Sequence, residues 1–255
     1  MKEIIICIIA GLGAGLGTGF AGMSAAVVIA PLLITFLGVD PYLAVGIALA
    51  SDVLASAASA IMYAKNKNID IKNGLLMMVS VLLFTFVGSF IASLTSATLM
   101  GNFSLFITII LGLKFIIKPV TAPKKRFESL SQKKKYILSV LCGAFVGFIC
   151  GFVGAGGGMM MLMVLVMVLG YELKCAVGTS VFIMSFTALT GAISHFTLGV
   201  FPSPTIFITC IISTLVFALI AAKLANKVNP VVMNRITGAI LVILGISMVI
   251  VNYGI

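Results

Sequence analysis

Residues 143–158 read GAFVGFICGFVGAGGG, and residues 11–26 read GLGAGLGTGFAGMSAA. Both stretches lie inside strongly apolar segments, where a helix is the expected structure. Each glycine in a helix interior costs about 1 kcal/mol relative to alanine. The two glycine clusters therefore predict that the chain interrupts its helix at both places.

The composition indicates a membrane protein. Of the 255 residues, 62% are hydrophobic and 9% are charged, and the mean hydropathy is +1.30. A soluble domain carries about 25% charged residues, so this chain has too few to cover a surface that faces water. We expect an all-α polytopic protein in the cell (inner) membrane, with the lipid bilayer as its partner. The net charge of +10 then reports orientation and not nucleic-acid binding.

The apolar segments fall into two classes by length. A helix needs about 20 apolar residues to cross the hydrocarbon core. Two segments, 4–37 and 136–169, have 34 residues each, which is too long for one straight helix and too short for two crossings plus a turn. Each carries its glycine cluster near the middle. The segments that match a single crossing are 42–64, 73–94, 99–118, 175–198, 204–226 and 231–253.

The chain reads as two membrane repeats, 1–118 and 136–255, joined by a basic cytoplasmic linker at 119–135. Shared apolar composition would scatter leucine and alanine matches but would not align five glycines. Such internal repeats are the usual construction of secondary transporters. A shift of 132 residues superposes Gly11, Gly15, Gly19, Gly22 and Gly38 on Gly143, Gly147, Gly151, Gly154 and Gly170.

The basic residues favour inverted repeats. If each 34-residue segment crosses the membrane once, the Lys and Arg residues divide 12 to 4 between the two sides. If each segment enters and returns as a re-entrant (or short paired) hairpin followed by three transmembrane helices, 15 of the 16 share one side and Lys2 is opposite. Because positive residues prefer the cytoplasm, the second arrangement places the N-terminus outside. A spanning helix broken once, in parallel repeats, remains the alternative.

The hairpin tips are the predicted binding site. The second arm of each hairpin begins at the tip, so its unpaired N–H groups and about half a positive charge point at the bilayer centre. Glycine permits the reversal and lets a ligand approach the backbone, so the paired tips would form an anion site. The expected substrate-binding residues are Gly22, Met23, Ser24, Gly154, Gly156, Gly157 and Gly158, together with Ser51, Thr179 and Ser180 close to the matching AVG sequences.

The outer glycines, at 11, 15 and 19 and at 143, 147 and 151, have small-xxx-small spacing. This spacing is typical of helices that approach each other closely in membranes. We expect packing to be their role. Packing explains the three consecutive glycines at 156–158 poorly.

Asp52 is the one carboxylate inside a predicted crossing. A charge at the bilayer centre costs at least about 2.5–3.5 kcal/mol, and such a residue is a functional candidate. Binding of a coupling ion or a proton is one interpretation, and a structural ion pair or a water-facing position is the other. The sequence leaves both open.

No motif supports catalysis, a metal site or a cofactor. Ser194 and His195 are adjacent, and neighbouring side chains on a helix diverge, so they do not form a nucleophile and base pair. An intramembrane hydrolase is therefore a weak alternative, and we expect no enzyme. A cation-coupled or proton-coupled transporter of another small solute is the stronger alternative.

Two stretches resemble the signature repeats of the TauE/SafE family of sulfite exporters: GFVGAGGGMMML…LG at 151–170 and GFAGMSAAVVIAPLLITFLGVDPYLAVGIALAS at 19–51. The resemblance covers essentially the whole chain. It implies export of a small sulfur-containing anion, such as sulfite or a sulfonate, without selecting among them. The first copy departs from the family's glycine run at Met23–Ala26, and Met163 stands where the first copy has Pro31. The oligomeric state stays open, a homodimer being one outcome.

Overall fold

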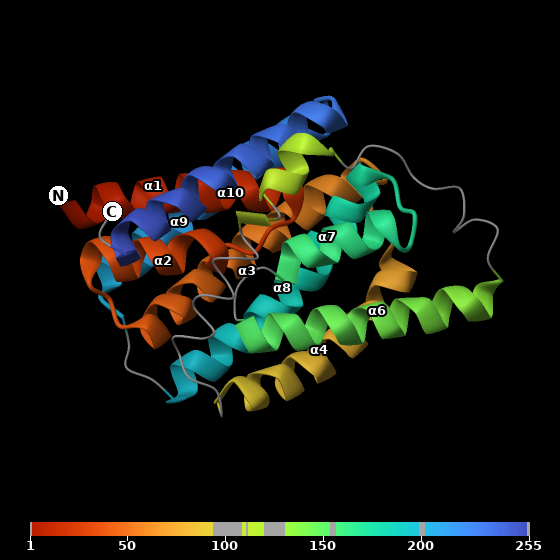
Figure 1. Ribbon diagram of the computed structural model, residues 1–255, viewed down its shortest axis with the longest axis horizontal. Coiled ribbons are helices and arrows are strands. Elements are labelled where there is room, and N and C mark those ends of the chain that lie inside the picture. The colour runs from red at the N-terminus through yellow and green to blue at the C-terminus, as the bar shows by residue number, and fades with distance from the viewer. Residues whose placement is uncertain are drawn as a thin grey trace.

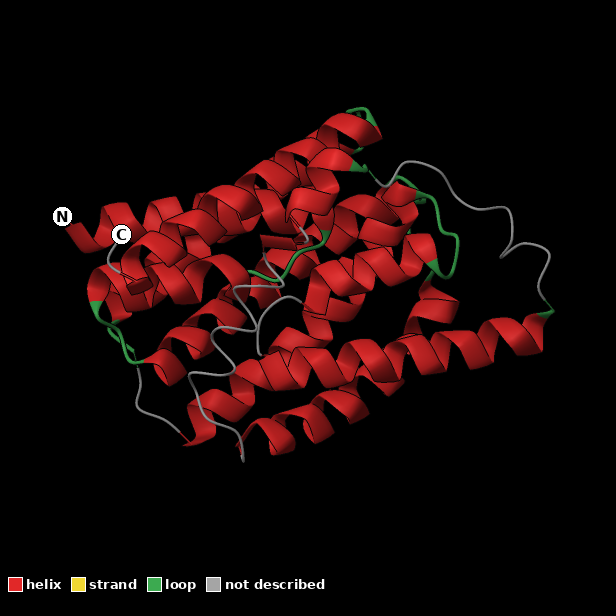
Figure 2. Cartoon of the chain, in the orientation of Figure 1, coloured by secondary structure: helices red, strands yellow, loops and turns green. Residues whose placement is uncertain are grey.

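The computed structural model describes residues 2–93, 109–110, 112–119, 131–153, 157–198 and 202–253. Helices account for every regular element within these ranges (Figures 1 and 2). The helices are α1 (Lys2–Ala21), α2 (Ala26–Leu37), α3 (Pro41–Lys65), α4 (Ile71–Ser93), α6 (Gln132–Val153), α7 (Gly157–Met167), α8 (Leu173–Leu198), α9 (Pro204–Ala225) and α10 (Pro230–Tyr253).

The prediction of a multi-pass membrane protein is confirmed. In the described residues five helices, α1, α3, α4, α8 and α9, are long and apolar enough to cross a membrane. The predicted crossings at 42–64, 73–94, 175–198, 204–226 and 231–253 coincide with α3, α4, α8, α9 and α10. Most of the segment predicted at 99–118 lies outside the described residues.

Both 34-residue segments are divided, as their glycine clusters predict. The first is divided into α1 and α2 with a break at 22–25, and the second into α6 and α7. The arms of the first segment are unequal, because α1 has 20 residues and α2 has 12. At 1.5 Å per residue α1 is about 30 Å long, enough to cross the hydrocarbon core by itself. This length is not predicted by the sequence pattern.

The turns that follow α2 and α7 have the same geometry. Gly38 and Gly170 have φ values of +62° and +68°. One residue later, Val39 N–H donates to Leu33 O at 3.2 Å and Tyr171 N–H donates to Leu165 O at 2.9 Å. This left-handed glycine with a 6→1 hydrogen bond is the Schellman motif. The predicted alignment of Gly38 with Gly170 therefore corresponds to one repeated helix ending.

Small residues let α1 lie directly against α9, and the two helices run in the same direction. A Cβ on Gly15 would lie 2.7 Å from Ala218 N, and one on Gly19 would lie 2.5 Å from Ala221 Cβ. On α6, a Cβ on Gly143 would lie 2.8 Å from Met77 O of α4. Such distances leave no room for a larger side chain, so these glycines have the packing role predicted for the outer row.

Hydrogen bonds join three connections at one end of the molecule. Asn68, between α3 and α4, donates through Nδ2 to Asn226 Oδ1 at 2.7 Å. Lys174, at the start of α8, donates to Asn226 O at 2.6 Å. Tyr171 Oη donates to Asp70 Oδ2 at 2.8 Å. The α3–α4, α7–α8 and α9–α10 connections therefore meet there, while the N-terminus and the α2–α3 turn lie at the other end (Figure 1).

Candidate functional site

The first break has a fixed shape. Gly22 has a φ of +60°, which glycine adopts without strain. Gly22 N–H donates to Thr18 O at 2.9 Å, and Met23 N–H donates to Gly17 O at 3.3 Å. Thr18 Oγ1 donates to Met23 O at 2.8 Å. These bonds end α1 and turn the chain into α2, so the break is a built turn within the protein.

The start of α7 touches the first break. We call this contact region the junction, and it consists of Gly22–Ala25, Gly157–Gly158 and Ser180. A Cβ on Gly158 would lie 2.5 Å from Gly22 O and 2.8 Å from Ser24 N. Backbone therefore meets backbone, and only glycine fits at position 158. The sequence predicts that the two glycine-rich segments converge, and these residues do.

Ser180 of α8 connects the two breaks. Its buried Oγ lies 3.1 Å from Gly22 O and 3.2 Å from Gly158 O. A hydroxyl has one proton to donate, so it serves one carbonyl at a time. This shared donor holds the ends of two segments that are more than a hundred residues apart in the chain.

Asp52 lies at the depth of the junction. From the turn at 38–40, α2 extends back for 12 residues, about 18 Å, and Asp52 is about 17 Å along α3 from Pro41. Its side chain is 0% exposed. Ser56 Oγ donates to Asp52 Oδ1 at 2.7 Å, and the carboxyl also faces the Ser24 hydroxyl and the Ala25 N–H.

Two of the predicted site residues use their hydroxyls away from the junction. Ser51 Oγ donates to Ile47 O of its own helix at 2.8 Å. Thr179 Oγ1 accepts from Asp70 N–H at 3.0 Å, which ties α8 to the α3–α4 connection. A binding role for these two side chains stays a prediction.

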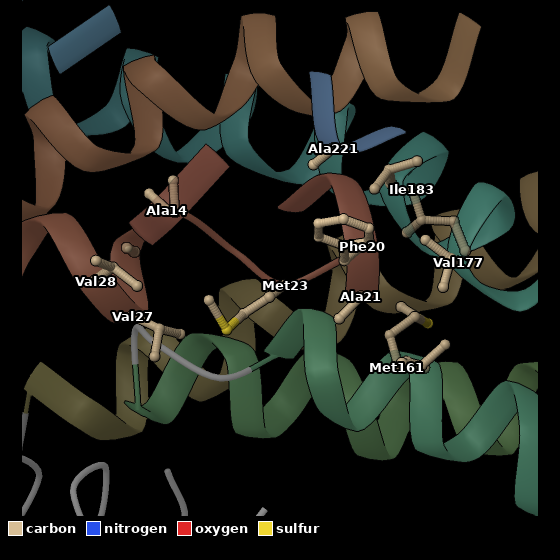
Figure 3. Close-up of a cluster of buried hydrophobic side chains, with 14 of the residues drawn as sticks. Ala14, Phe20, Ala21, Met23, Val27, Val28, Met161, Val177, Ile183 and Ala221 are labelled. Atoms are coloured by element: carbon tan, nitrogen blue, oxygen red, sulfur yellow. The ribbon is translucent and has the colours of Figure 1, made fainter. Parts of the chain in front are cut away.

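The other predicted residues divide by position. Met23 is fully buried among apolar side chains that include Met161 of α7 and Val177 of α8 (Figure 3). Gly157 is the first residue of α7. Gly154 and Gly156 lie outside the described residues.

Tyr63 and Ser56 are not among the predicted site residues. The buried Oη of Tyr63 donates to Gly19 O at 2.8 Å, just before the first break, and Ser56 bonds Asp52. A signal for both was present, because 52, 56, 59 and 63 follow the i, i+4, i+7, i+11 spacing of one helix face. Among the described residues, no group of three or more His, Cys, Asp and Glu side chains could hold a metal ion.

Comparison with known proteins identifies the family. The profile of the family described as "Sulfite exporter TauE/SafE" matches residues 7–248. The chain is 26% identical over 217 residues to the probable membrane transporter protein YunE of Bacillus subtilis, covering 77% of this chain and 80% of that one. It is 25% identical over 262 residues to the probable membrane transporter protein MJ0441 of Methanocaldococcus jannaschii, covering 96% and 95%.

These matches extend across both glycine-rich breaks and nearly all of the helices around them. The chain therefore belongs to the TauE/SafE family and is a multi-pass membrane transporter.

Proposed function

We propose that this transporter exports a small sulfur-containing anion, such as sulfite or a sulfonate, through a site at the junction. The observation that supports it is the direct contact between the two helix breaks at Gly158, Gly22 and Ser24. Non-helical backbone at membrane depth occurs where it is buried in protein or lines a water-filled cavity, and in many transporters such helix breaks form the substrate site. The family's description as a sulfite exporter suggests the substrate class.

The start of α7 supplies the groups that an anion requires. The first N–H groups of a helix have no partner within it, and they carry about half a positive charge. Gly157 and Gly158 present these groups without side chains. In the described conformation the first break lies directly against Gly158, so we expect substrate entry to separate the first break from the start of α7. The expected contributions of Gly154 and Gly156 extend the same site.

We further propose that the two halves are inverted repeats, with the N-terminus outside and the linker inside the cell membrane. Hydrogen bonds join the α3–α4, α7–α8 and α9–α10 connections at one end. Lys114 contacts Met163 and Met167 near the end of α7 at that same end. Lys2 begins α1 at the opposite end (Figure 1). This one-sided distribution is what the positive-inside rule requires.

The energetics suit export. A potential that is negative inside favours outward movement of an anion by about 2.3 kcal/mol per charge per 100 mV. A route through the membrane and a site for the anion are therefore sufficient, without a second energy source.

The test is flux of labelled sulfite, methanesulfonate and chloride from proteoliposomes, with empty liposomes as the control. We expect both sulfur anions to leave faster than from the control vesicles, with chloride slower. Equal rates for all three anions would contradict selection of a sulfur anion, and the absence of all three fluxes would contradict the proposed function.

A further inference from the structure

One face of α3 carries a buried row of polar side chains. Asp52, Ser56, Ser59 and Tyr63 are each 0% exposed. They follow one another at helical spacing from the level of the junction toward the end where the α3–α4 connection lies. Side chains three and four positions apart are neighbours on a helix, so the row is continuous.

Two atoms of this row lack hydrogen-bond partners. Among the described residues, Asp52 Oδ2 and Ser59 Oγ are buried and have no partner at full hydrogen-bond geometry, although the Ser24 hydroxyl and the Ala25 N–H face the Asp52 carboxyl. Buried polar atoms are nearly always paired, and an exception needs an explanation. A buried serine on a helix usually donates to the carbonyl four residues earlier. Ser59 Oγ does not make this bond. The row therefore has unused capacity to hold a proton or a water molecule.

No cation balances Asp52 in the described structure. Cys150 of α6 interacts with it electrostatically, and α2 contains no ionisable residue. The nearest basic groups of α3 itself begin at Lys65. Helices α1, α8 and α9 also contact α3, and their ionisable residues lie toward the helix ends: Lys2, Glu3, Cys7, Lys174, Cys175, His195, Cys210 and Lys223.

The second half of the chain has no counterpart of the carboxylate and serines of this row. Under the shift of 132 residues, Asp52 corresponds to Met184, Ser56 to Ala188 and Ser59 to Gly191, while Tyr63 corresponds to His195. Met184 and Ala188 are buried in α8. The buried carboxylate of α3 thus has no acidic equivalent in α8, whereas the start of α7 carries Gly157 and Gly158.

An ionised Asp52 would repel a substrate anion bound at the junction. Its carboxyl faces Ser24 and the N–H of Ala25, at the start of α2, which is where a helix attracts anions. A substrate anion at the adjacent start of α7 would face this carboxylate inside a medium of low dielectric constant, where repulsion is strong. The repulsion disappears when the carboxylate is protonated.

We propose that the two breaks have different roles: the start of α7 holds the anion, and Asp52 takes up one proton whenever the anion binds. The reaction at Asp52 is the addition of one proton to a carboxylate oxygen. The proton comes from water on the side from which the anion enters, and it returns to water on the side where the anion leaves. This inference rests on the proposed function, since it assigns the coupling of the same site.

Charge balance gives the consequence. A dianion that leaves with one proton still carries one net negative charge, so the membrane potential continues to drive its export. A monovalent sulfonate that leaves with one proton carries no net charge. The distribution of the sulfonate at equilibrium then depends on the pH gradient and is independent of the membrane potential.

The test uses labelled methanesulfonate, which stays ionised, in proteoliposomes with either a pH gradient or a potassium diffusion potential. For the wild type we expect a tenfold accumulation ratio per pH unit and no response to potential. Asp52→Asn, a permanent mimic of the neutral form, should reverse this pattern, with about tenfold per 59 mV and no response to pH. Asp52→Glu should retain the wild-type pattern.

Asp40→Asn is the matched control. Its carboxylate caps α3 at the surface through Tyr42 and Leu43 N–H groups, at 3.0 and 3.1 Å, and we expect the wild-type pattern. Wild-type accumulation that follows the potential, or an unchanged pattern in Asp52→Asn, would overturn the proposal.

A second measurement separates this proposal from the proposed function. If the wild type transports no sulfur anion, the proposed function fails. Infrared difference spectra then measure independently whether the Asp52 carboxyl takes up a proton. We expect a protonated-carboxyl band that disappears as the pH is raised and is missing in Asp52→Asn. A spectrum without that band, or with one that does not titrate, would overturn the assignment of a proton to Asp52.

Discussion

Substitution of Gly158 by alanine tests the junction with a single methyl group. The new Cβ would lie 2.5 Å from Gly22 O and 2.8 Å from Ser24 N, short of the 3.4 Å at which ordinary contact begins. Both neighbours are backbone atoms, so the first break must move by up to 0.9 Å. Overpacking of this kind costs about 1–3 kcal/mol, of which the better helix propensity of alanine recovers up to about 1 kcal/mol.

The methyl group also stands where an anion has to approach the start of α7. A ligand present at a hundred times its Kd stabilises the protein that binds it by about 2.7 kcal/mol. We expect sulfite to raise the melting temperature of the purified wild type and to leave that of Gly158→Ala unchanged. Efflux of labelled sulfite from proteoliposomes should fall to the rate of empty vesicles.

Gly38→Ala is the matched control for this experiment. Gly38 has a φ of +62°, and nothing lies within 4 Å of the position of its Cβ, so alanine there costs about 1–2 kcal/mol of backbone strain. The two variants should lose similar stability, but Gly38→Ala should keep sulfite-dependent stabilisation and transport. Equal stabilisation by sulfite in both variants would refute a binding site at the junction.

Three further predictions follow from the contacts around the junction. Ser180→Ala removes the donor that Gly22 O and Gly158 O share, so thermal melting should show a loss of stability of about 1–3 kcal/mol. Ser185 Oγ bonds only within α8, so Ser185→Ala should lose clearly less stability. Equal losses in the two variants would argue against a shared donor. Tyr63→Phe leaves the buried Gly19 carbonyl without its donor and should cost about 1–3 kcal/mol, whereas an unchanged melting temperature would show that this bond contributes nothing. In a chain without its native cysteines, Lys2→Cys should react with an impermeant thiol reagent added outside, and Lys67→Cys and Lys227→Cys should not react. External labelling of Lys227→Cys would contradict inverted repeats.

The sequence predicted the helix breaks well because glycine clusters have a local effect. A run of glycines weakens a helix wherever it occurs, so the break at 22–25 and the start of α7 at Gly157 could be located without tertiary information. The length of α1 could not, because the same apolar residues suit a short arm and a full crossing equally.

Side-chain roles were harder to predict because they depend on rotation about each helix. Thr179 and Ser180 are neighbours in sequence, yet one bonds Asp70 and the other faces both breaks. Consecutive helical residues point about 100° apart, so only the packing of α8 decides which hydroxyl reaches the junction. The periodic row from Asp52 to Tyr63 is the opposite case, since its spacing was legible in the sequence.

The most direct measurement of the central claim is an experimental structure of the protein with selenite, the selenium analogue of sulfite, located by its anomalous scattering. We predict one selenium peak within hydrogen-bond distance of the first N–H groups of α7 and close to Ser180, with Gly22–Ser24 displaced from Gly158. A peak only among the lysines at the end that holds the α3–α4 and α9–α10 connections, with the two breaks still in contact, would contradict an anion site at the junction.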